Sequence, residues 1–370
     1  MIKKLNIIAL NVPYPPDYGG VIDAYYRIEA LSRMGIEIYL HCFEYGREKS
    51  AELNKLCKTV TYYKRKTGLV TQLSCRPYIV SSRMSDKLVN NLKINDFPIL
   101  FEGLHTTFCI QHPDLKKRIK IVRAHNIEHQ YYRTLVKLEG NIFRKLYFIL
   151  EAYRLEHYES VLVSADHVMC VSDKEHEYFQ NKYHNSVFIP SSHPYQNVEC
   201  LHGLGSFVIY HGDLSVNEND TISKFLINEV FSKIPYPCVI AGKNPSNTLR
   251  RAAEKTPNVQ LIANPNQSEM KALLSDAQIH LLPVMQNNGL KLKLLLALYA
   301  GRHCLVNKSM VDGTSLEPLC HLAETPLEMI EKIHHLMSMT LTTEMIENRK
   351  HYLLENYSNE KNAEKLIELL

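Results

Sequence analysis

Two lysines at the start of an apolar helix form the most informative candidate site in the sequence. Leu290–Ala300 is predicted to be a buried helix because its residues are apolar nearly all round, and its only charges are Lys291 and Lys293 in the first turn. Cations stabilise the C-terminal end of a helix, so this placement is unfavourable for a purely structural helix. It is favourable if an anion binds the unpaired N–H groups of the first turn. The alternative is that both lysines extend to water.

Other polar residues also stand directly after predicted strands. Ligands bind at the C-terminal ends of the strands in open α/β sheets, and lysines and helix N-termini placed there suit a phosphate or diphosphate. Two of these residues, Gly19 and Gly20, are adjacent, but they do not match GxGxxG, and no Walker A motif is present. The pattern therefore favours neither a dinucleotide-binding fold nor a P-loop enzyme. A plain tight turn is the other interpretation of Gly19-Gly20. The residues placed in this way are Gly19, Gly20, His105, His125, Asp213, Lys243 and the run Asn288–Lys293.

The segment HNIEH at 125–129 also matches the H-x-x-E-H pattern of zinc proteases. Either Glu151 or Glu156 could be the third ligand, and the spacing selects neither. His125 directly follows a predicted strand, whereas the pattern needs both histidines on one helix, so zinc is the weaker interpretation. A hydrogen-bonded structural role for His125 and His129 is the remaining alternative.

The elements that must position these residues alternate between strands and helices. The first βαβ unit is predicted at Leu5–Leu10, Val21–Met34 and Ile36–Phe43, with Ile22, Tyr25, Ile28 and Leu31 on one face of the helix. A later unit has strands at Ile279–Pro283 and His303–Val306, a polar loop at Gln286–Gly289, and Gly301 as a left-handed helix stop. The alternation predicts two α/β domains: 1–190, a linker at 191–205, 206–345, and a helical segment at 346–370.

The helix predicted at 142–164 mixes aromatic and aliphatic residues with paired charges. We expect it to face the core; a membrane-surface helix is the alternative. The chain has 370 residues, a net charge of +4 and nine scattered cysteines, which is typical of a reduced, cytoplasmic protein and too weakly basic for nucleic acid. No run is long and apolar enough to span a bilayer.

Several stretches, taken in order, resemble bacterial glycosyltransferases of the GT-B fold, family 4 type (glycosyl transferases group 1). The resemblance covers nearly the whole chain. It implies two Rossmann-like α/β domains that face each other across a cleft, with a C-terminal helix packing back. The stretches are PYPPDYGG with the following helix and strand, VRAHNIEHQYYRTL, SADHVMCVSDKE, YHGDLSVNEND, VIAGKNPS and residues 276–307.

The resemblance further implies a retaining, metal-independent hexosyltransferase without a cofactor. Its donor would be a UDP- or GDP-linked nucleotide sugar, and its acceptor a glycan or lipid-linked oligosaccharide of surface polysaccharide synthesis. His125 would lie near the transferred sugar as the catalytic residue, and Gly19-Gly20 would contact donor phosphate or acceptor. Lys243, Lys291 and Lys293 would neutralise the diphosphate. Peripheral attachment to the inner face of the cytoplasmic membrane would use basic residues near Lys64–Lys66 or Arg144-Lys145.

The sequence departs from the family pattern at both glutamates and at the arginine of its motifs. Asn288 and Leu296 stand where the family places paired glutamates, and Asp213 and Leu214 stand near the expected arginine. Gly289 with Lys293 resembles a GxxxK variant. A non-catalytic GT-B subunit that activates a partner is therefore the second hypothesis. A zinc hydrolase, or an epimerase using Glu102 or Asp213, completes the alternatives.

Overall fold

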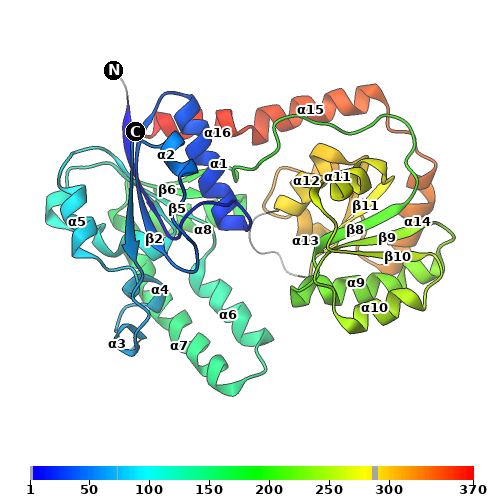
Figure 1. The fold of residues 1–370 in the computed structure, drawn as a ribbon, viewed down its shortest axis with the longest axis horizontal. Coiled ribbons are helices and arrows are strands. Elements are labelled where there is room, and N and C mark those ends of the chain that lie inside the picture. Colours follow the sequence, from blue (N-terminus) through cyan, green and yellow to red (C-terminus); the bar gives the residue numbers. More distant parts are fainter. Residues whose placement is uncertain (1–2, 73, 286–290) are drawn as a thin grey trace. The chain divides into compact units, whose positions relative to one another are not determined.

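The computed structural model describes residues 3–72, 74–285 and 291–370. They form two compact units (Figure 1). The first contains the chain up to Pro194 and the segment Tyr357–Leu370, and the second contains the described residues between them. The first boundary thus lies within the predicted linker at 191–205, and the return to the first unit comes later than the predicted start of the last segment at 346.

The first unit is built on a parallel sheet of seven strands in the order β3-β2-β1-β4-β5-β6-β7. Helices cover both faces of the sheet. One face carries α1 (Gly19–Arg33), α2 (Glu52–Leu56) and α16 (Asn359–Glu368). The strands are β1 (Lys4–Ala9), β2 (Glu37–Glu44), β3 (Thr59–Lys64), β4 (Ile99–Glu102), β5 (Lys120–Ala124), β6 (His167–Cys170) and β7 (Ser186–Phe188).

The alternation of side chains along β1 shows how this sheet acquires two cores. Ile7 packs in the cluster beneath α1, whereas Ile8 packs in the cluster on the opposite face, because successive strand residues point to opposite sides. Ala363 and Leu366 of α16 complete the first cluster, so the C-terminal helix packs back on this unit as predicted. The second face carries α4 (Tyr78–Ser81), α5 (Asp86–Leu92), α7 (Ile142–Tyr158) and α8 (Asp173–Tyr183); α3 (Leu69–Gln72) and α6 (Glu128–Leu138) lie beside it.

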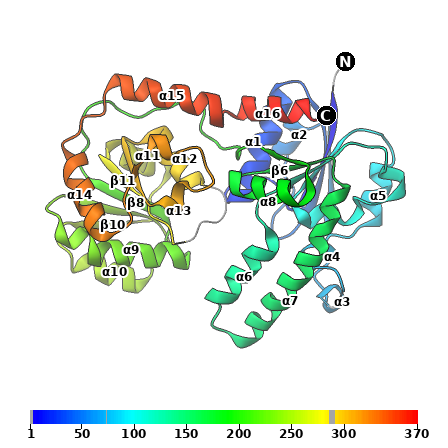
Figure 2. The same ribbon diagram turned by 180° about the vertical axis from the view of Figure 1, so that it is seen from behind.

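The second unit contains a parallel sheet of six strands in the order β10-β9-β8-β11-β12-β13. In both views of the ribbon, α9 and α10 cover one face of this sheet, and α11 and α12 cover the other (Figures 1 and 2). The strands are β8 (Val208–Asp213), β9 (Cys238–Lys243), β10 (Val259–Ala263), β11 (Ile279–Leu281), β12 (His303–Val306) and β13 (His321–Leu322). The helices are α9 (Asn217–Glu229), α10 (Asn247–Glu254), α11 (Gln267–Asp276), α12 (Leu292–Ala300), α13 (Lys308–Val311), α14 (Pro326–Met337) and α15 (Thr343–Tyr357).

Each sheet reverses its direction of growth at one point. The first strand of the unit lies next to the fourth: β1 pairs with β4, and β8 pairs with β11. The helices that follow these strands leave on opposite faces, which opens a crevice at the carboxyl end of the strands. A ligand is therefore expected at these two points. The helices of the described residues include none long and apolar enough to cross a membrane.

Three local predictions were wrong, each for a physical reason. Gly301 has φ −103° and is not left-handed; a glycine is required because a Cβ would lie 1.9 Å from Nε2 of His280. The helix predicted at 142–164 ends at Tyr158 and continues as a 3-10 turn. The α1 face predicted from apolar residues is incomplete, because the charged Asp23 and Arg27 are buried with Ile28 and Leu31.

Candidate functional site

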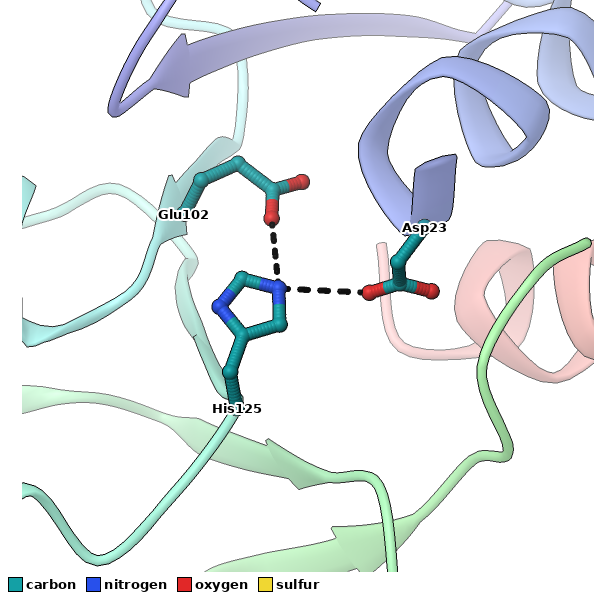
Figure 3. A group of neighbouring side chains, drawn as sticks. All are labelled: Asp23, Glu102 and His125. Atoms are coloured by element: carbon teal, nitrogen blue, oxygen red, sulfur yellow. Dashed lines mark ion pairs between the residues drawn. The ribbon is translucent and has the colours of Figure 1, made fainter. Parts of the chain in front are cut away.

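His125 lies in a buried group of charged side chains in the first unit. It follows β5 directly, and its Nε2 is 3.3 Å from Oδ2 of Asp23 on α1 and 3.6 Å from Oε2 of Glu102 at the end of β4 (Figure 3). The Nδ1 atom points away from both carboxylates (Figure 3). The histidine predicted from its position after a strand thus stands at the β1/β4 reversal, where a ligand is expected.

Two buried arginines hold both carboxylates in place. Arg27, one turn after Asp23 on α1, donates to Oδ2 of Asp23 at 3.0 Å and to both oxygens of Glu102 at 2.8 and 2.9 Å. Arg123 of β5 donates to both Asp23 oxygens at 3.0 and 3.1 Å and to the Ile189 carbonyl at 2.6 Å. The bidentate geometry is the strongest form of carboxylate–guanidinium pairing.

The charges of this group are balanced without a ligand. Two carboxylates face two guanidinium groups, and His125 is the fifth member. Burial alone would raise the pKa of Asp23, but Arg123 and Arg27 outweigh burial and hold that pKa well below its usual range. Asp23 therefore stays ionised at neutral pH, and the hydrogen bonds of the group fix the carboxylates that face the His125 ring.

Asp23, Glu102 and His125 are also the group of potential metal ligands found among the described residues. The hydrogen bonds argue against a metal here, because both carboxylates already bind guanidinium groups and a divalent cation would add charge beside two arginines. The zinc pattern in HNIEH is not realised either. His125 precedes α6, while His129 lies on it and contacts Glu159 at 3.1 Å.

Glu128, the third polar residue of HNIEH, lies in a different environment. It is buried at the start of α6, with Oε1 4.0 Å from Nδ1 of His105. Burial raises the pKa of Glu128 to about 7, and burial also lowers the pKa of His105 well below its usual range. His105, which sequence reasoning placed after a strand, thus faces an acid that exchanges its proton near neutral pH.

Gly19 and Gly20 form the first turn of α1, at the carboxyl end of β1. The preceding residue, Tyr18, gives no side-chain cap, and no acidic residue lies in the first turn. A Cβ at Gly20 would meet no atom within 4 Å, so the glycine leaves open space beside the helix N-terminus. Backbone N–H groups in such a position can bind an anion or a hydroxyl group.

Lys293 is the charged residue at the strand reversal of the second unit. Its amino group donates to Oδ1 of Asn219 at 2.7 Å and to the Tyr210 hydroxyl at 3.2 Å, and it lies 4.7 Å from the centre of the Tyr210 ring. The side chain also covers the backbone of Gly212, where a Cβ would lie 3.1 Å from Nζ. Lysine therefore lies across the end of β8, beside the start of α12.

The charge of Lys293 is only partly offset inside the protein. Burial lowers the pKa of Lys293 to about 8 although the Glu218 carboxylate opposes this effect, and no salt bridge of Lys293 is found among the described residues. α12 itself has neither a side-chain cap nor an acidic residue in its first turn. A largely buried cation beside an uncapped helix N-terminus favours an anion as the missing partner.

The other predicted residues of this unit are more varied. Lys291 is the N-cap residue of α12 and directly precedes its first helical residue, Leu292. Lys243 is exposed at the end of β9, level with Asp213 at the end of β8. Asp213 acts as a turn residue, because its Oδ1 accepts from both the backbone and the hydroxyl of Ser215. Asn288 and Gly289 lie outside the described residues.

Sequence reasoning missed several of the side chains that build these sites. Asp23 and Arg27 were hidden by the apolar pattern of α1, although an acid and an arginine four residues apart on one helix are a known pairing signal. Arg123 follows two apolar residues inside a buried strand, and a charge at such a position is itself a signal. Tyr210 and Asn219 gave no signal, since they contact Lys293 only through the fold.

Comparison with known proteins places the fold but not the family. No family model matches the sequence. The chain is 24% identical over 384 aligned residues to an uncharacterized 44.6 kDa protein in the cps region of Klebsiella pneumoniae, covering 97% of this chain and 98% of that one. The relative carries no activity in its name, so this match gives no function by itself.

Solved structures resemble the whole chain. TarM has a TM-score of 0.67 at 12% identity, covering 100% of this chain and 99% of TarM. A glycosyltransferase from Rickettsia africae has a TM-score of 0.64 at 13% identity, covering 100% of this chain and 97% of that one. A UDP-forming α,α-trehalose-phosphate synthase from Burkholderia vietnamiensis has a TM-score of 0.61 at 10% identity, covering 99% of this chain and 99% of that one. At such identities the likeness concerns the fold, and the chain has the GT-B fold with its two α/β domains.

Proposed function

We propose that the chain is a retaining glycosyltransferase of the family 4 type that transfers a hexose from a nucleotide sugar during surface polysaccharide synthesis. Support comes from the solved structures that share its fold, which include named glycosyltransferases, and from the relative named for its cps region. The acceptor would be a glycan or a lipid-linked oligosaccharide. The described cysteines are all free, which suits the cytoplasm, where nucleotide-sugar chemistry would take place.

Lys293 is the observation that carries this proposal. Its half-buried side chain lies at the strand reversal of the second unit, and Glu218 acts on its charge only from beyond ion-pair distance. A nucleoside diphosphate would supply the missing negative charge, and the uncapped start of α12 would add backbone donors. The same contacts strengthen as the diphosphate leaves the sugar and gains charge, which is how a preorganised cation lowers the barrier. Lys291 and Lys243 would add further positive charge, and no cofactor is required.

His125 would bind the transferred sugar in the first unit. Its Nε2 faces the carboxylates of Asp23 and Glu102, so we place the imidazole proton on that nitrogen. Nδ1 is then the unprotonated nitrogen, and it points away from the carboxylates (Figure 3). It can accept a hydrogen bond from a sugar hydroxyl and hold the ring while an oxocarbenium-like centre forms. Gly19 and Gly20 would contact donor phosphate or acceptor in the same unit.

A non-catalytic GT-B subunit remains the second candidate because of one observation. Leu296, where the family pattern has a glutamate, is an aliphatic residue of α12 and cannot accept hydrogen bonds from a ribose. Asn288, at the other glutamate position, lies outside the described residues. Binding of a nucleotide without turnover would favour this candidate.

The test is a thermal-shift screen with UDP, GDP, ADP, CMP and the corresponding nucleotide sugars. A ligand at about a hundred times its Kd stabilises the folded state by about 2.7 kcal/mol. We expect a rise in Tm with UDP or GDP, lost in Lys293→Met and kept in Lys332→Met, which removes an exposed lysine of α14 in the same unit.

Two results would contradict the proposal. If no nucleotide raises the Tm, the chain has no donor site, and the non-catalytic subunit becomes the better hypothesis. If a nucleotide raises the Tm equally in Lys293→Met, the donor binds elsewhere and the argument from the buried cation fails. When a nucleotide does bind, hydrolysis of its sugar conjugate by wild type but not by His125→Phe would separate an enzyme from a binding subunit.

A further inference from the structure

The helix α7 leaves one apolar face uncovered. The sequence predicted a core-facing helix, but only Glu151, Ala152 and Leu155 of α7 are buried. Six of the 18 large apolar side chains exposed among the described residues lie on this helix, with Phe143 79% and Ile142 60% exposed. We call these six residues the α7 face: Ile142, Phe143, Leu146, Ile149, Leu150 and Tyr153.

The α7 face is a continuous stripe and not a scatter of single residues. At about 100° per residue, its six positions fall within an arc of about 120° on one side of the helix. The stripe extends from the first residue of α7 past its middle. In both views of the ribbon, α6 and α7 form a hairpin that projects from the sheet of the first unit (Figures 1 and 2). A stripe of this width on a projecting hairpin indicates an interaction surface.

The charges around the stripe are positive. The acids of the hairpin have partners: Glu151 pairs with Arg154 at 2.8 Å and Glu156 with Arg133 at 2.6 Å. Glu128 is buried, and Glu139 accepts a hydrogen bond from the backbone of Asn141. The bases are different, because the described residues offer no ion-pair partner to the three located at the hairpin tip and the start of α7: Lys137, Arg144 and Lys145.

The segment that packs against α7 adds further positive charge. Tyr78 of α4 donates its backbone N–H to Glu151 at 2.7 Å, and Arg154 donates to the Gln72 carbonyl at 3.1 Å. This segment carries the exposed bases Lys66 and Arg76. The apolar stripe is therefore bordered by basic side chains contributed by α7 itself and by its neighbour.

We propose that the α7 face docks on the surface of an anionic phospholipid membrane. An apolar stripe with aromatic residues and flanking cations is the pattern of a helix that lies in the interface plane, where the side chains enter the acyl region and the bases meet anionic headgroups. The charge decides between this partner and a second copy of the chain. Two copies meeting through the stripe would bring unpaired cations together, whereas an anionic surface neutralises them.

The α7 face contains none of the residues at either strand reversal and needs no nucleotide, so its test is independent of the donor site. Purified full-length protein is floated with vesicles of a zwitterionic phospholipid, with and without an anionic phospholipid. We expect recovery with the anionic vesicles, and at least tenfold weaker binding for the triple variant Phe143→Ser, Leu146→Ser, Leu150→Ser. These side chains are exposed, so the Tm should stay unchanged.

A matched variant removes the same amount of exposed apolar surface elsewhere. Ile94→Ser, Leu204→Ser and Leu327→Ser alter side chains exposed by 80%, 55% and 65% and should float as wild type. Arg144→Gln with Lys145→Gln should weaken flotation on anionic vesicles only. Failure of wild type to float with either vesicle, or equal flotation of the first triple variant, would overturn the proposal. A dimer in sedimentation that the first triple variant dissociates would instead make the α7 face an interface between copies.

Discussion

Replacing Lys293 by methionine should make the protein more stable, because the lysine is buried at a cost. Burial lowers its pKa from the ordinary 10.5 to about 8. A shift of this size corresponds to about 3 kcal/mol at pH values below 8, since each pKa unit represents about 1.4 kcal/mol. Methionine fills a similar volume without charge. The Tyr210 hydroxyl still donates to Asn219 at 3.0 Å, so neither partner is stranded.

The expected gain is about 2 to 3 kcal/mol at pH 7, after about 1 kcal/mol is allowed for the hydrogen bond that Asn219 loses. Its pH dependence follows from the protons bound in each state. Below pH 8 the amino group is charged in both states, and the full penalty applies. Between pH 8 and 10.5 the unfolded chain holds more protons than the folded one, so the wild type gains stability as pH rises. Above 10.5 the penalty is gone.

Urea unfolding at pH 7, 9 and 10 measures this difference directly. The gap between Lys293→Met and wild type should be largest at pH 7 and shrink at each step. Lys332→Met, at an exposed position, should differ from wild type by less than about 0.5 kcal/mol throughout. A methionine variant that is no more stable at pH 7, or whose gain is constant with pH, would refute the assignment of a buried, charged lysine.

Two further substitutions test the packing that supports the candidate sites. Asp23→Asn leaves Arg123 buried without its bidentate carboxylate, so we expect a loss of about 3 to 5 kcal/mol in urea unfolding; a loss below 1 kcal/mol would show that the group is hydrated. Gly301→Ala places a Cβ 1.9 Å from Nε2 of His280 and should lower the free energy of unfolding by about 1 to 3 kcal/mol or more. The Cβ of Gly20→Ala meets no atom within 4 Å, so helix propensity should raise the free energy of unfolding by up to about 1 kcal/mol. Equal Tm changes for the two alanines would contradict the packing argument, and weaker ligand binding by Gly20→Ala alone would place Gly20 at a site.

The sequence predicted the elements of the fold better than their surfaces. His303–Val306 is a strand with the expected bounds, and α12 starts two residues after its predicted position. These predictions succeeded because a short apolar run bounded by a glycine depends on local sequence alone. The order of strands in each sheet depends on pairing between distant segments, and a single sequence carries no direct signal for it. The sequence favoured a core-facing α7 and kept a membrane-surface helix as the alternative, because apolar periodicity is the same whether the partner is a core or a membrane.

In the candidate sites, too, local features could be predicted from the sequence and contacts between distant segments could not. Position after a strand predicted that His125 and Lys293 lie near strand ends, and the structure places both there, because the carboxyl ends of parallel strands meet at one edge of a sheet. It could not show that Asp213 is used as a turn residue, or that Asp23 and Arg123, a hundred residues apart, bind each other. Gly301 was assigned a left-handed conformation, although its actual constraint is the imidazole of His280 packed against its Cα.

The charge balance of the two units indicates which of them requires an anion. Arg27 and Arg123 in the first unit are as deeply buried as any cation in the described chain, yet each has a carboxylate within 3.0 Å. Their positive charge is cancelled inside the protein, so the group orients His125 without attracting a diphosphate. Lys293 occupies the equivalent reversal in the second unit, where its hydrogen-bond partners are a hydroxyl and an amide and Glu218 acts on it only from a longer distance. Burial of a cation beyond ion-pair distance of a carboxylate is unfavourable, so an anionic ligand at this reversal would stabilise Lys293, and we expect the nucleotide to bind the second unit.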